Sequence, residues 1–388
     1  MSRCQRPLSQ TVAAVPPSGI RRFFELVSQM EDVIALGVGE PDFPTPWSIA
    51  SEAVAGLKLG RTSYTSNYGL LSLRRAISRH LQRLYQVTYD PEKELLVTVG
   101  VSEGLDLALR AILNPGDEVV VPQPCYVSYV PGVIFAGGVP VPVETSVERG
   151  FVVSPEQVEA ALTPRTKALL IGHPNNPTGA VLPETTLRTL AELAEGHDLL
   201  VISDEIYDRL RYGTPHCCFA SLPGMKERTI LLNGFSKAYS MTGWRVGYAA
   251  APAEILALMV KIHQYTMLCA PITGQLAALE ALRWGENAVR RMVREYDRRR
   301  RFLVQGLNRL GLECLEPQGA FYAFPSIRRT GLSSEEFCQR LLREERVAVV
   351  PGNAFGPCGE GHVRMTYATS LDHLREALVR LERFLSRL

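Results

Sequence analysis

One lysine and one arginine occupy a loop between two apolar segments in the second half of the chain. Residues 229–232 lead into the loop and residues 246–251 lead out of it, and both segments are typical of buried strands. The loop itself, residues 233–245, places Lys237 and Arg245 among glycine, serine and threonine. A lysine at the end of a rigid strand suits covalent chemistry, because its amine can be partly desolvated and directed. The alternative is a solvent-exposed Ser-Lys turn without chemical function.

Two more polar residues follow strand-like segments. Asp204 ends the apolar run 199–203, where an unpaired buried carboxylate would be costly and therefore needs a partner. Asn176 lies in an Asn-Pro-Thr-Gly turn after residues 168–172. Ligands of open α/β sheets bind at the carboxyl ends of strands, so both residues are candidates for a binding site. A salt bridge or helix cap for Asp204, and a plain turn for Asn176, are the structural alternatives.

A helix start after the strand-like residues 95–99 is a candidate anion site. A glycine leads from this segment into an amphipathic helix that begins near Val101 and Ser102. Free N–H groups and the positive end of the helix dipole attract anions at such a place, although many helix starts bind nothing. Tyr126 follows another strand-like segment, 119–122, and its ring either stacks on a flat heteroaromatic ligand or packs in the core.

Three other segments carry residues that are unusual for their surroundings. Arg364 interrupts the strand-like run 363–368, and its guanidinium suits a carboxylate; the alternative is a surface arginine on an edge strand. Gly39 belongs to residues 36–46, whose glycines allow the backbone to approach a ligand and whose prolines fix its path. Tyr64 lies in a polar, turn-like segment that by itself indicates a surface loop with packed tyrosines.

Together these segments resemble the class I aminotransferases. Ser236-Lys237, followed after three residues by Met-Thr-Gly-Trp-Arg-Val-Gly, is similar to the pyridoxal-phosphate lysine motif of that family. Residues 37–43 are similar to its Gly-x-Gly-x-Pro-Asp-Phe segment. The motifs run in family order from about residue 36 to 370, so the resemblance covers nearly the whole chain.

The resemblance implies fold type I, an α/β fold with a mainly parallel central sheet in a large domain and a small α+β domain from both chain ends. We expect residues 48–283 to form the large cofactor-binding domain. Residues 1–47 and 284–388 would then form the small domain with an N-terminal arm. Helical spacing further predicts a short helix over residues 20–30 and a long one over residues 286–310, the latter with four consecutive arginines on a solvated, ion-paired face.

The resemblance also assigns catalytic roles. Lys237 binds pyridoxal 5'-phosphate covalently and, once displaced by the substrate, moves the Cα proton as general base and acid. Asp204 faces the pyridine nitrogen of the cofactor and keeps it protonated, which makes the ring an electron sink. Tyr207 reaches the phenolic oxygen of the cofactor.

The remaining candidates bind the cofactor or the substrate by the same resemblance. The residues around the cofactor phosphate are Val101, Ser102, Ser236, Arg245 and, from the other subunit, Tyr64. Tyr126 stacks on the cofactor ring, where the family often has Trp or Phe, and Asn176 binds the phenolic oxygen. The residues that meet the substrate are Gly39, Asn176 and Arg364. Gly234 departs from relatives with a phosphate-binding serine at that position, and Ser236 would supply the hydroxyl instead.

Composition narrows the class of protein. The chain has 388 residues, 46% of them hydrophobic, which is enough for a large core. Its formal net charge of +2 does not indicate nucleic acid or an anionic membrane as partner. Residues 1–30 lack an apolar leader and no apolar run approaches a membrane span, so we expect a soluble, cytoplasmic protein. The eight cysteines form no Cys-x-x-Cys pair, so we expect no metal, and we interpret His216-Cys217-Cys218 as structural.

The predicted function is an aminotransferase that moves an amino group from an aromatic or broad range of L-amino acids to 2-oxoglutarate with ping-pong kinetics. The predicted assembly is a homodimer with shared active sites, as in the family. Aspartate aminotransferase is the close rival, because the resemblance includes thermophile enzymes of both kinds. A lyase, synthase or decarboxylase on the same fold, and a non-catalytic regulator, are the alternatives from other classes. A nicotinamide oxidoreductase is disfavoured because the dinucleotide fingerprint is missing.

Overall fold

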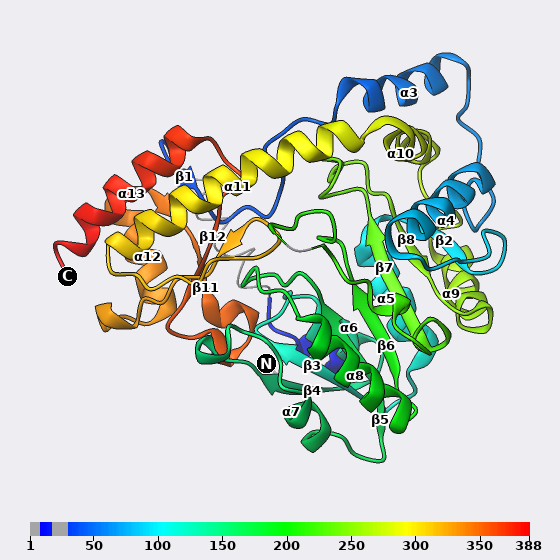
Figure 1. The fold of residues 1–388 in the computed structure, drawn as a ribbon, viewed down its shortest axis with the longest axis horizontal. Helices are drawn as coiled ribbons and strands as arrows, with labels where there is room; N and C mark the ends of the chain where they lie inside the picture. The colour runs from blue at the N-terminus through cyan, green and yellow to red at the C-terminus, as the bar shows by residue number, and fades with distance from the viewer. Residues whose placement is uncertain (1–7, 18–29, 214) are drawn as a thin grey trace, which may run out of the picture.

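The computed structural model describes residues 8–17, 30–213 and 215–388. Apart from Met30, the helix predicted over residues 20–30 lies outside these residues. Two groups of elements make up the described chain, a large sheet with its helices and a smaller α+β unit (Figure 1). None of the described helices is both long and apolar enough to cross a membrane.

The larger group is built on a seven-stranded sheet in the order β2-β8-β7-β6-β5-β3-β4. Its strands are β2 (Leu95–Thr98), β3 (Glu118–Gln123), β4 (Val139–Glu144), β5 (Thr166–Gly172), β6 (Leu200–Asp204), β7 (Thr229–Gly234) and β8 (Gly247–Ala250). In this sheet β8 runs in the direction opposite to the other six strands. The mainly parallel sheet predicted for the fold is therefore confirmed.

Helices cover both faces of this sheet, which explains why its inner strands are apolar on both sides. The helices that share a core with one face are α5 (Gly100–Ile112), α6 (Tyr129–Phe135) and α9 (Ala253–Thr266). Those on the opposite face are α3 (Trp47–Lys58), α4 (Leu71–Tyr85), α7 (Pro155–Ala160), α8 (Glu184–Gly196) and α10 (Ile272–Trp284). A short helix, α1 (Gln10–Ala14), precedes all of these in the chain.

The smaller unit combines segments from both parts of the chain. Near the beginning of the chain, β1 (Ile34–Ala35) pairs in parallel with β10 (Val347–Ala348). A three-stranded antiparallel sheet has the order β11-β12-β9 and consists of β9 (Tyr322–Ala323), β11 (Val350–Pro351) and β12 (Val363–Thr366). Two helices, α12 (Ser334–Glu345) and α13 (Leu371–Leu385), pack on these strands in a core of their own. Residues 347–351 therefore form two short strands that pair with different partners.

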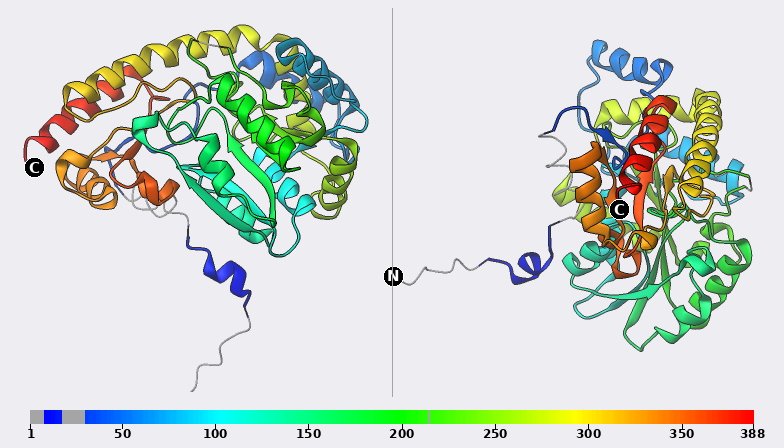
Figure 2. Two further views of the ribbon diagram at one scale, coloured as in Figure 1. Left: turned by 60° about the horizontal axis from the view of Figure 1, so that its bottom comes forward. Right: turned by 90° about the vertical axis from the view of Figure 1, so that its left-hand side faces the viewer.

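A long helix, α11 (Glu286–Arg309), runs from the end of α10 to α13 and spans both groups (Figures 1 and 2). Its four arginines do not all lie on a solvated face. Arg298 and Arg301 are exposed and paired with acidic residues, as predicted, but Arg299 and Arg300 are buried. Arg299 binds both carboxylate oxygens of Asp42, at 2.9 and 2.8 Å. Two arginines of the run are therefore buried. The ion pair of Arg299 with Asp42 fixes the segment that carries Gly39.

Residues 205–213 and 215–228, the described part of the connection from β6 to β7, contain no α-helix. The interval of 33 residues from Asp204 to Lys237 is long enough for either a helix or a loop between the two strands. In the structure it carries two short 3-10 turns, Phe219–Ser221 and Lys226–Arg228, before β7 pairs in parallel with β6. Asp204 and the loop after β7 therefore meet at the same edge of the sheet.

Candidate active site

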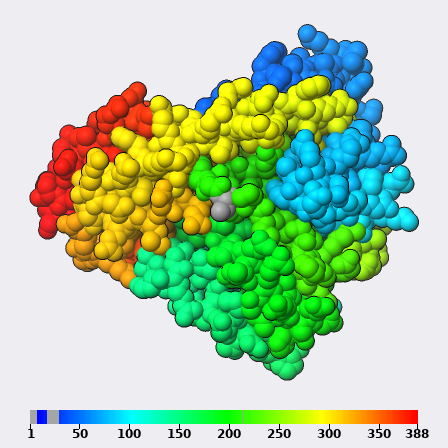
Figure 3. Space-filling view, in the orientation of Figure 1, coloured from blue at the N-terminus to red at the C-terminus, as the bar shows by residue number. Residues whose placement is uncertain are grey.

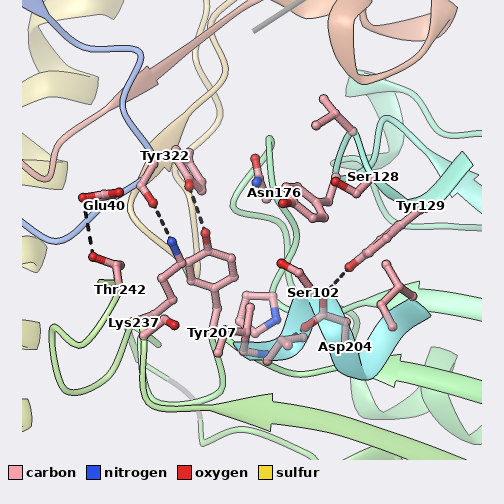
Figure 4. Close-up of a pocket in the computed structure, with 18 of the residues that line it drawn as sticks. Glu40, Ser102, Ser128, Tyr129, Asn176, Asp204, Tyr207, Lys237, Thr242 and Tyr322 are labelled. Atoms are coloured by element: carbon pink, nitrogen blue, oxygen red, sulfur yellow. Dashed lines mark hydrogen bonds between the residues drawn. The ribbon is translucent and has the colours of Figure 1, made fainter. Parts of the chain in front are cut away.

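A cavity of about 750 Å³ lies at the carboxyl ends of β5, β6 and β7, between the sheet and the smaller unit. Eleven of the twelve predicted site residues line it: Gly39, Val101, Ser102, Tyr126, Asn176, Asp204, Tyr207, Ser236, Lys237, Arg245 and Arg364. Figure 4 shows several of these side chains around the cavity. Tyr64 is the exception, because it does not line the cavity and its side chain is 83% exposed.

Lys237 lies in the turn after β7, where the strand ends at Gly234. Its Nζ donates a hydrogen bond to the carbonyl oxygen of Gly39 at 2.5 Å. Burial lowers the pKa of the Lys237 amine to about 8, although the nearby Glu40 carboxylate acts in the opposite direction. An appreciable fraction of this amine is therefore neutral near physiological pH, as a nucleophile or proton acceptor requires.

Asp204 is the last residue of β6 and is 7% exposed. Its Oδ2 accepts a hydrogen bond from the hydroxyl of Tyr129 at 2.9 Å, and its Oδ1 accepts one from the backbone N–H of Ile206 at 3.2 Å. Burial raises the pKa of Asp204 to about 6, and these two hydrogen bonds oppose the rise. Within the described part of the chain this carboxylate has no ion-pair partner, so the salt bridge considered from the sequence is not found there.

The start of α5 and Arg245 form one end of the cavity. Gly100 opens the helix with a φ of +73°, and a Cβ at this position would lie 2.6 Å from Nη2 of Arg245. Only glycine allows the guanidinium to lie so close to the helix start. Arg245 also donates to the carbonyl oxygen of Thr242 at 3.1 Å. A positive side chain, free helix N–H groups and the hydroxyls of Ser102 and Ser236 thus surround a place suited to a phosphate.

Arg364 lies on β12, the middle strand of the small sheet, and is 3% exposed. The alternative of a surface arginine on an edge strand is therefore wrong. Its Nη1 donates to Oδ1 of Asn176 at 2.8 Å and its Nη2 donates to the carbonyl oxygen of Gly37 at 2.7 Å. Its Nε is buried and has no hydrogen-bond partner among the residues that the structure describes. Arg364 thus retains donor capacity beside the cavity, which suits an incoming carboxylate.

Two tyrosines at the cavity were missed by the sequence analysis. Tyr129 bonds to Asp204, and the hydroxyl of Tyr322 lies 2.8 Å from that of Tyr207. Both are almost fully buried. In the sequence, an aromatic residue in a strand or at a helix start indicates core packing. No sequence signal shows which residue its hydroxyl will meet.

The His216-Cys217-Cys218 segment lies outside the cavity. His216 Nε2 is 2.6 Å from Oε2 of Glu205, and its ring stacks on that of His173 with 4.7 Å between centroids. Burial lowers the pKa of His216 to about 4. Among the described residues no cluster of His, Cys, Asp and Glu is arranged to hold a metal ion.

The donor set fits a flat ring that carries an aldehyde and a phosphate. The amine of Lys237 can bind an aldehyde covalently, and the carboxylate of Asp204 can pair with a protonated ring nitrogen. The start of α5 can hold the phosphate, and Tyr126 offers an aromatic face on the cavity wall. The residues present therefore match pyridoxal 5'-phosphate, and the fold and the site define a pyridoxal-phosphate enzyme of fold type I.

Comparison with known proteins identifies the family. The family model described as aminotransferase class I and II matches residues 31–381. An aspartate aminotransferase of Pyrococcus abyssi is 47% identical over 383 residues, which cover 97% of this chain and 98% of the relative. An aromatic-amino-acid aminotransferase of Thermococcus litoralis is 45% identical over 383 residues, with the same coverage of both chains. The crystal structure of an aromatic aminotransferase from Pyrococcus horikoshii has a TM-score of 0.90 at 46% identity and covers 95% of this chain and 99% of that one.

The chain therefore belongs to the class I and II aminotransferases. It is an enzyme that transfers amino groups and depends on pyridoxal 5'-phosphate. The resemblance to this family stated from the sequence motifs is confirmed.

Proposed function

We propose that the enzyme transfers the amino group of an aromatic or broad range of L-amino acids to 2-oxoglutarate by a ping-pong mechanism. One observation carries this proposal: Lys237, Asp204 and Arg364 come from distant parts of the chain and line one cavity. An amine, a buried carboxylate and a guanidinium with spare donor capacity are the groups that such a reaction needs. Relatives named for aromatic amino acids and for aspartate support the reaction class and leave aspartate as the rival donor.

Bound pyridoxal phosphate supplies an aldehyde that binds amines and a ring that accepts the electron pair left when the substrate loses its Cα proton. Lys237 would hold this aldehyde through its amine between turnovers, and the amine would be free once an amino acid is bound. Its free amine, with a pKa near 8, then takes the Cα proton and returns it at a neighbouring carbon. Asp204 keeps the ring nitrogen protonated, and the hydrogen bond from Tyr129 favours the ionised carboxylate that this requires.

We assign binding roles to the other residues of the cavity. The residues proposed to hold the phosphate are Val101, Ser102, Ser236 and Arg245. Tyr126 stacks on the ring, and Tyr207 and Asn176 bind its phenolic oxygen. Arg364, with Gly39 and Asn176, orients the α-carboxylate of the substrate, and the buried, unpartnered Nε of Arg364 supports this role.

The charges in the cavity favour an uncharged substrate side chain. In the described chain the cationic side chains that line the cavity are Lys237, Arg245 and Arg364, and each already has a role above. None of these three described cations is left for the second carboxylate of aspartate. The second carboxylate of 2-oxoglutarate would then rely on neutral donors such as Ser128 and Thr242, which also line the cavity, or on a second subunit.

We propose a homodimer with shared active sites. Large apolar side chains are exposed on and around α3, which stands at the edge of the molecule (Figures 1 and 3). They include Trp47, Leu57, Leu59 and Tyr64 on and after α3, and the ends of α9 and α10 add Tyr265 and Trp284; all are at least 52% exposed. A hydrogen bond from Asn67 to Leu268 joins the loop after α3 to the residues that follow α9. A second, from Gln275 to Thr65, joins the same loop to the first turn of α10. A patch of this kind suits a second copy of the chain, which would bring Tyr64 to the neighbouring phosphate site. A monomer in sedimentation at micromolar concentration would contradict the proposal.

Domain organisation and location are further proposals. Residues 48–283 would form the large domain, and residues 1–47 and 284–388 the small domain with the N-terminal arm. The hydrophobic core of the smaller unit supports this division, because apart from Tyr207 and Leu210 its buried residues come from 34–36 and 292–384. The described cysteines are all free thiols, which fits the reducing cytoplasm that we propose as the location.

The test of the reaction is a half-reaction with one amino acid and no oxo acid. Holoenzyme is mixed with phenylalanine, tyrosine, aspartate or glutamate, and the released 2-oxo acid and the absorption of the bound cofactor are measured. We expect about one oxo acid per active site, fastest with an aromatic donor, and the amino group recovered as glutamate after 2-oxoglutarate is added. Release of ammonia or carbon dioxide would indicate a lyase or decarboxylase instead. No conversion with any donor would contradict the aminotransferase reaction.

A further inference from the structure

Tyr322 contacts two residues with proposed roles in the reaction. It lies on β9 and is 1% exposed, yet it reaches the cavity wall (Figure 4). Its hydroxyl is 2.8 Å from the hydroxyl of Tyr207. The guanidinium carbon of Arg364 lies 4.4 Å from the centroid of the Tyr322 ring, with Phe355 at 4.8 Å as its other aromatic neighbour. One side chain thus touches the proposed phenol ligand of the cofactor and the proposed carboxylate ligand of the substrate.

The hydroxyl of Tyr322 is also packed against the backbone near Lys237. A Cβ at Gly39 would lie 2.5 Å from the Tyr322 oxygen, so this glycine leaves the space that the hydroxyl uses. The carbonyl of the same glycine accepts the hydrogen bond from Lys237. The Tyr322 hydroxyl therefore has little room to turn away from Tyr207.

A count of protons sets the direction of the phenol–phenol hydrogen bond. Each phenol has one O–H and can donate once. If Tyr207 donates to the phenolic oxygen of the cofactor, only Tyr322 can donate between the two hydroxyls. A phenol that accepts a hydrogen bond becomes a stronger donor, because chains of hydrogen bonds polarise one another.

We propose that Tyr322 is a positioning residue with two separable parts. Its hydroxyl donates to Tyr207 and strengthens the hydrogen bond that Tyr207 makes to the cofactor. Its ring supports the guanidinium of Arg364 in the orientation that receives the substrate carboxylate. The inference rests on the roles proposed above for Tyr207 and Arg364.

The hydroxyl is tested with Tyr322→Phe, which keeps the ring. The readout is the pH midpoint of the absorption change of the bound cofactor, measured in the holoenzyme without substrate. We expect the midpoint to rise by about 0.3 pH unit, because a weaker donor stabilises the phenolic oxygen less. The KM for the amino donor should stay within about twofold, since the ring under Arg364 remains. Tyr207→Phe should raise the midpoint further, and adding Tyr322→Phe to it should have no additional effect.

The ring is tested with Tyr322→Leu. Removing it should raise the KM for the amino donor about tenfold relative to Tyr322→Phe, as expected for the loss of a desolvated cation–π contact. The affinity for pyridoxal phosphate should remain within about twofold of that of Tyr322→Phe. An unchanged KM would overturn the supporting role of the ring.

Tyr212→Phe is the matched control. Its hydroxyl donates to the carbonyl oxygen of Ala320 at 2.6 Å, and it does not line the cavity. It should leave both the midpoint and the KM unchanged. A midpoint shift in Tyr207→Phe with none in Tyr322→Phe, or additive shifts in the double variant, would overturn the inference about Tyr322 alone. No shift in Tyr207→Phe would overturn the proposed role of Tyr207 and this inference with it.

Discussion

The hydrogen bond from Tyr129 to Asp204 should control the pH range over which the apoenzyme binds its cofactor. Burial raises the pKa of Asp204 to about 6, and the Tyr129 hydroxyl opposes that rise from 2.9 Å. The carboxylate must be ionised to pair with a protonated ring nitrogen. Cofactor affinity should therefore fall as the pH drops through the pKa of Asp204.

The size of the effect of Tyr129→Phe follows from this contact. A hydrogen bond to a charged group contributes about 1.5–3 kcal/mol, and one pKa unit corresponds to about 1.4 kcal/mol. Losing the bond should raise the pKa of Asp204 by about one to two units, to between roughly 7 and 8. At pH 7 the ionised fraction would fall from about nine-tenths to about a quarter, so the affinity should drop about fourfold. At pH 9 the native enzyme and Tyr129→Phe should bind pyridoxal phosphate with nearly equal affinity.

The assay is the Kd of apoenzyme and pyridoxal phosphate between pH 5 and 9, by equilibrium dialysis. The ratio of the Kd values of the native enzyme and Tyr129→Phe isolates the contribution of Asp204, because Lys237 and the phosphate site are the same in both proteins. Tyr85→Phe is the matched control, since its hydroxyl bonds to the buried Asp208 at 2.5 Å but outside the cavity. This variant removes a comparable hydrogen bond and should leave the pH dependence of the Kd unchanged. A Tyr129→Phe profile that superimposes on the native one would refute the reasoning.

Three further substitutions test the proposed chemistry. Lys237→Ala should abolish turnover, because it removes the covalent ligand and the proton carrier, while dialysis still detects bound cofactor; retained turnover would exclude this role. Asp204→Asn should lower kcat by orders of magnitude, because a neutral amide does not hold the ring nitrogen protonated, and a near-normal rate would make the carboxylate structural. Arg364→Lys should raise the KM for the amino donor by about 10- to 100-fold, because the two-pronged contact is lost, with little change in cofactor affinity; an unchanged KM would exclude Arg364 as the carboxylate ligand.

Local sequence patterns indicated the inner strands of the large sheet and several residues of the cavity. Continuous apolar runs predicted the inner strands β5, β6 and β7, because strands covered on both faces need apolar residues on both sides. Polar residues directly after such runs then predicted Asp204 and Lys237, because the carboxyl ends of parallel strands meet at one edge of a sheet. The roles of Arg364, Gly39 and Tyr64 depended on the resemblance, since their own surroundings favoured surface or turn positions.

Contacts between distant segments were decided only by the tertiary structure. Whether Arg364 lies at an edge or in the middle of a sheet depends on β9 and β11 pairing on its two sides, and no local pattern encodes that pairing. Whether Arg299 is solvated depends on Asp42, 257 residues earlier in the chain. Tyr129 and Tyr322 look like core aromatics in the sequence, because the partner of a phenolic hydroxyl is set by the packing of other elements. The sequence by itself thus determined which groups could carry the chemistry, and the three-dimensional packing decided which of them touch and how their pKa values shift.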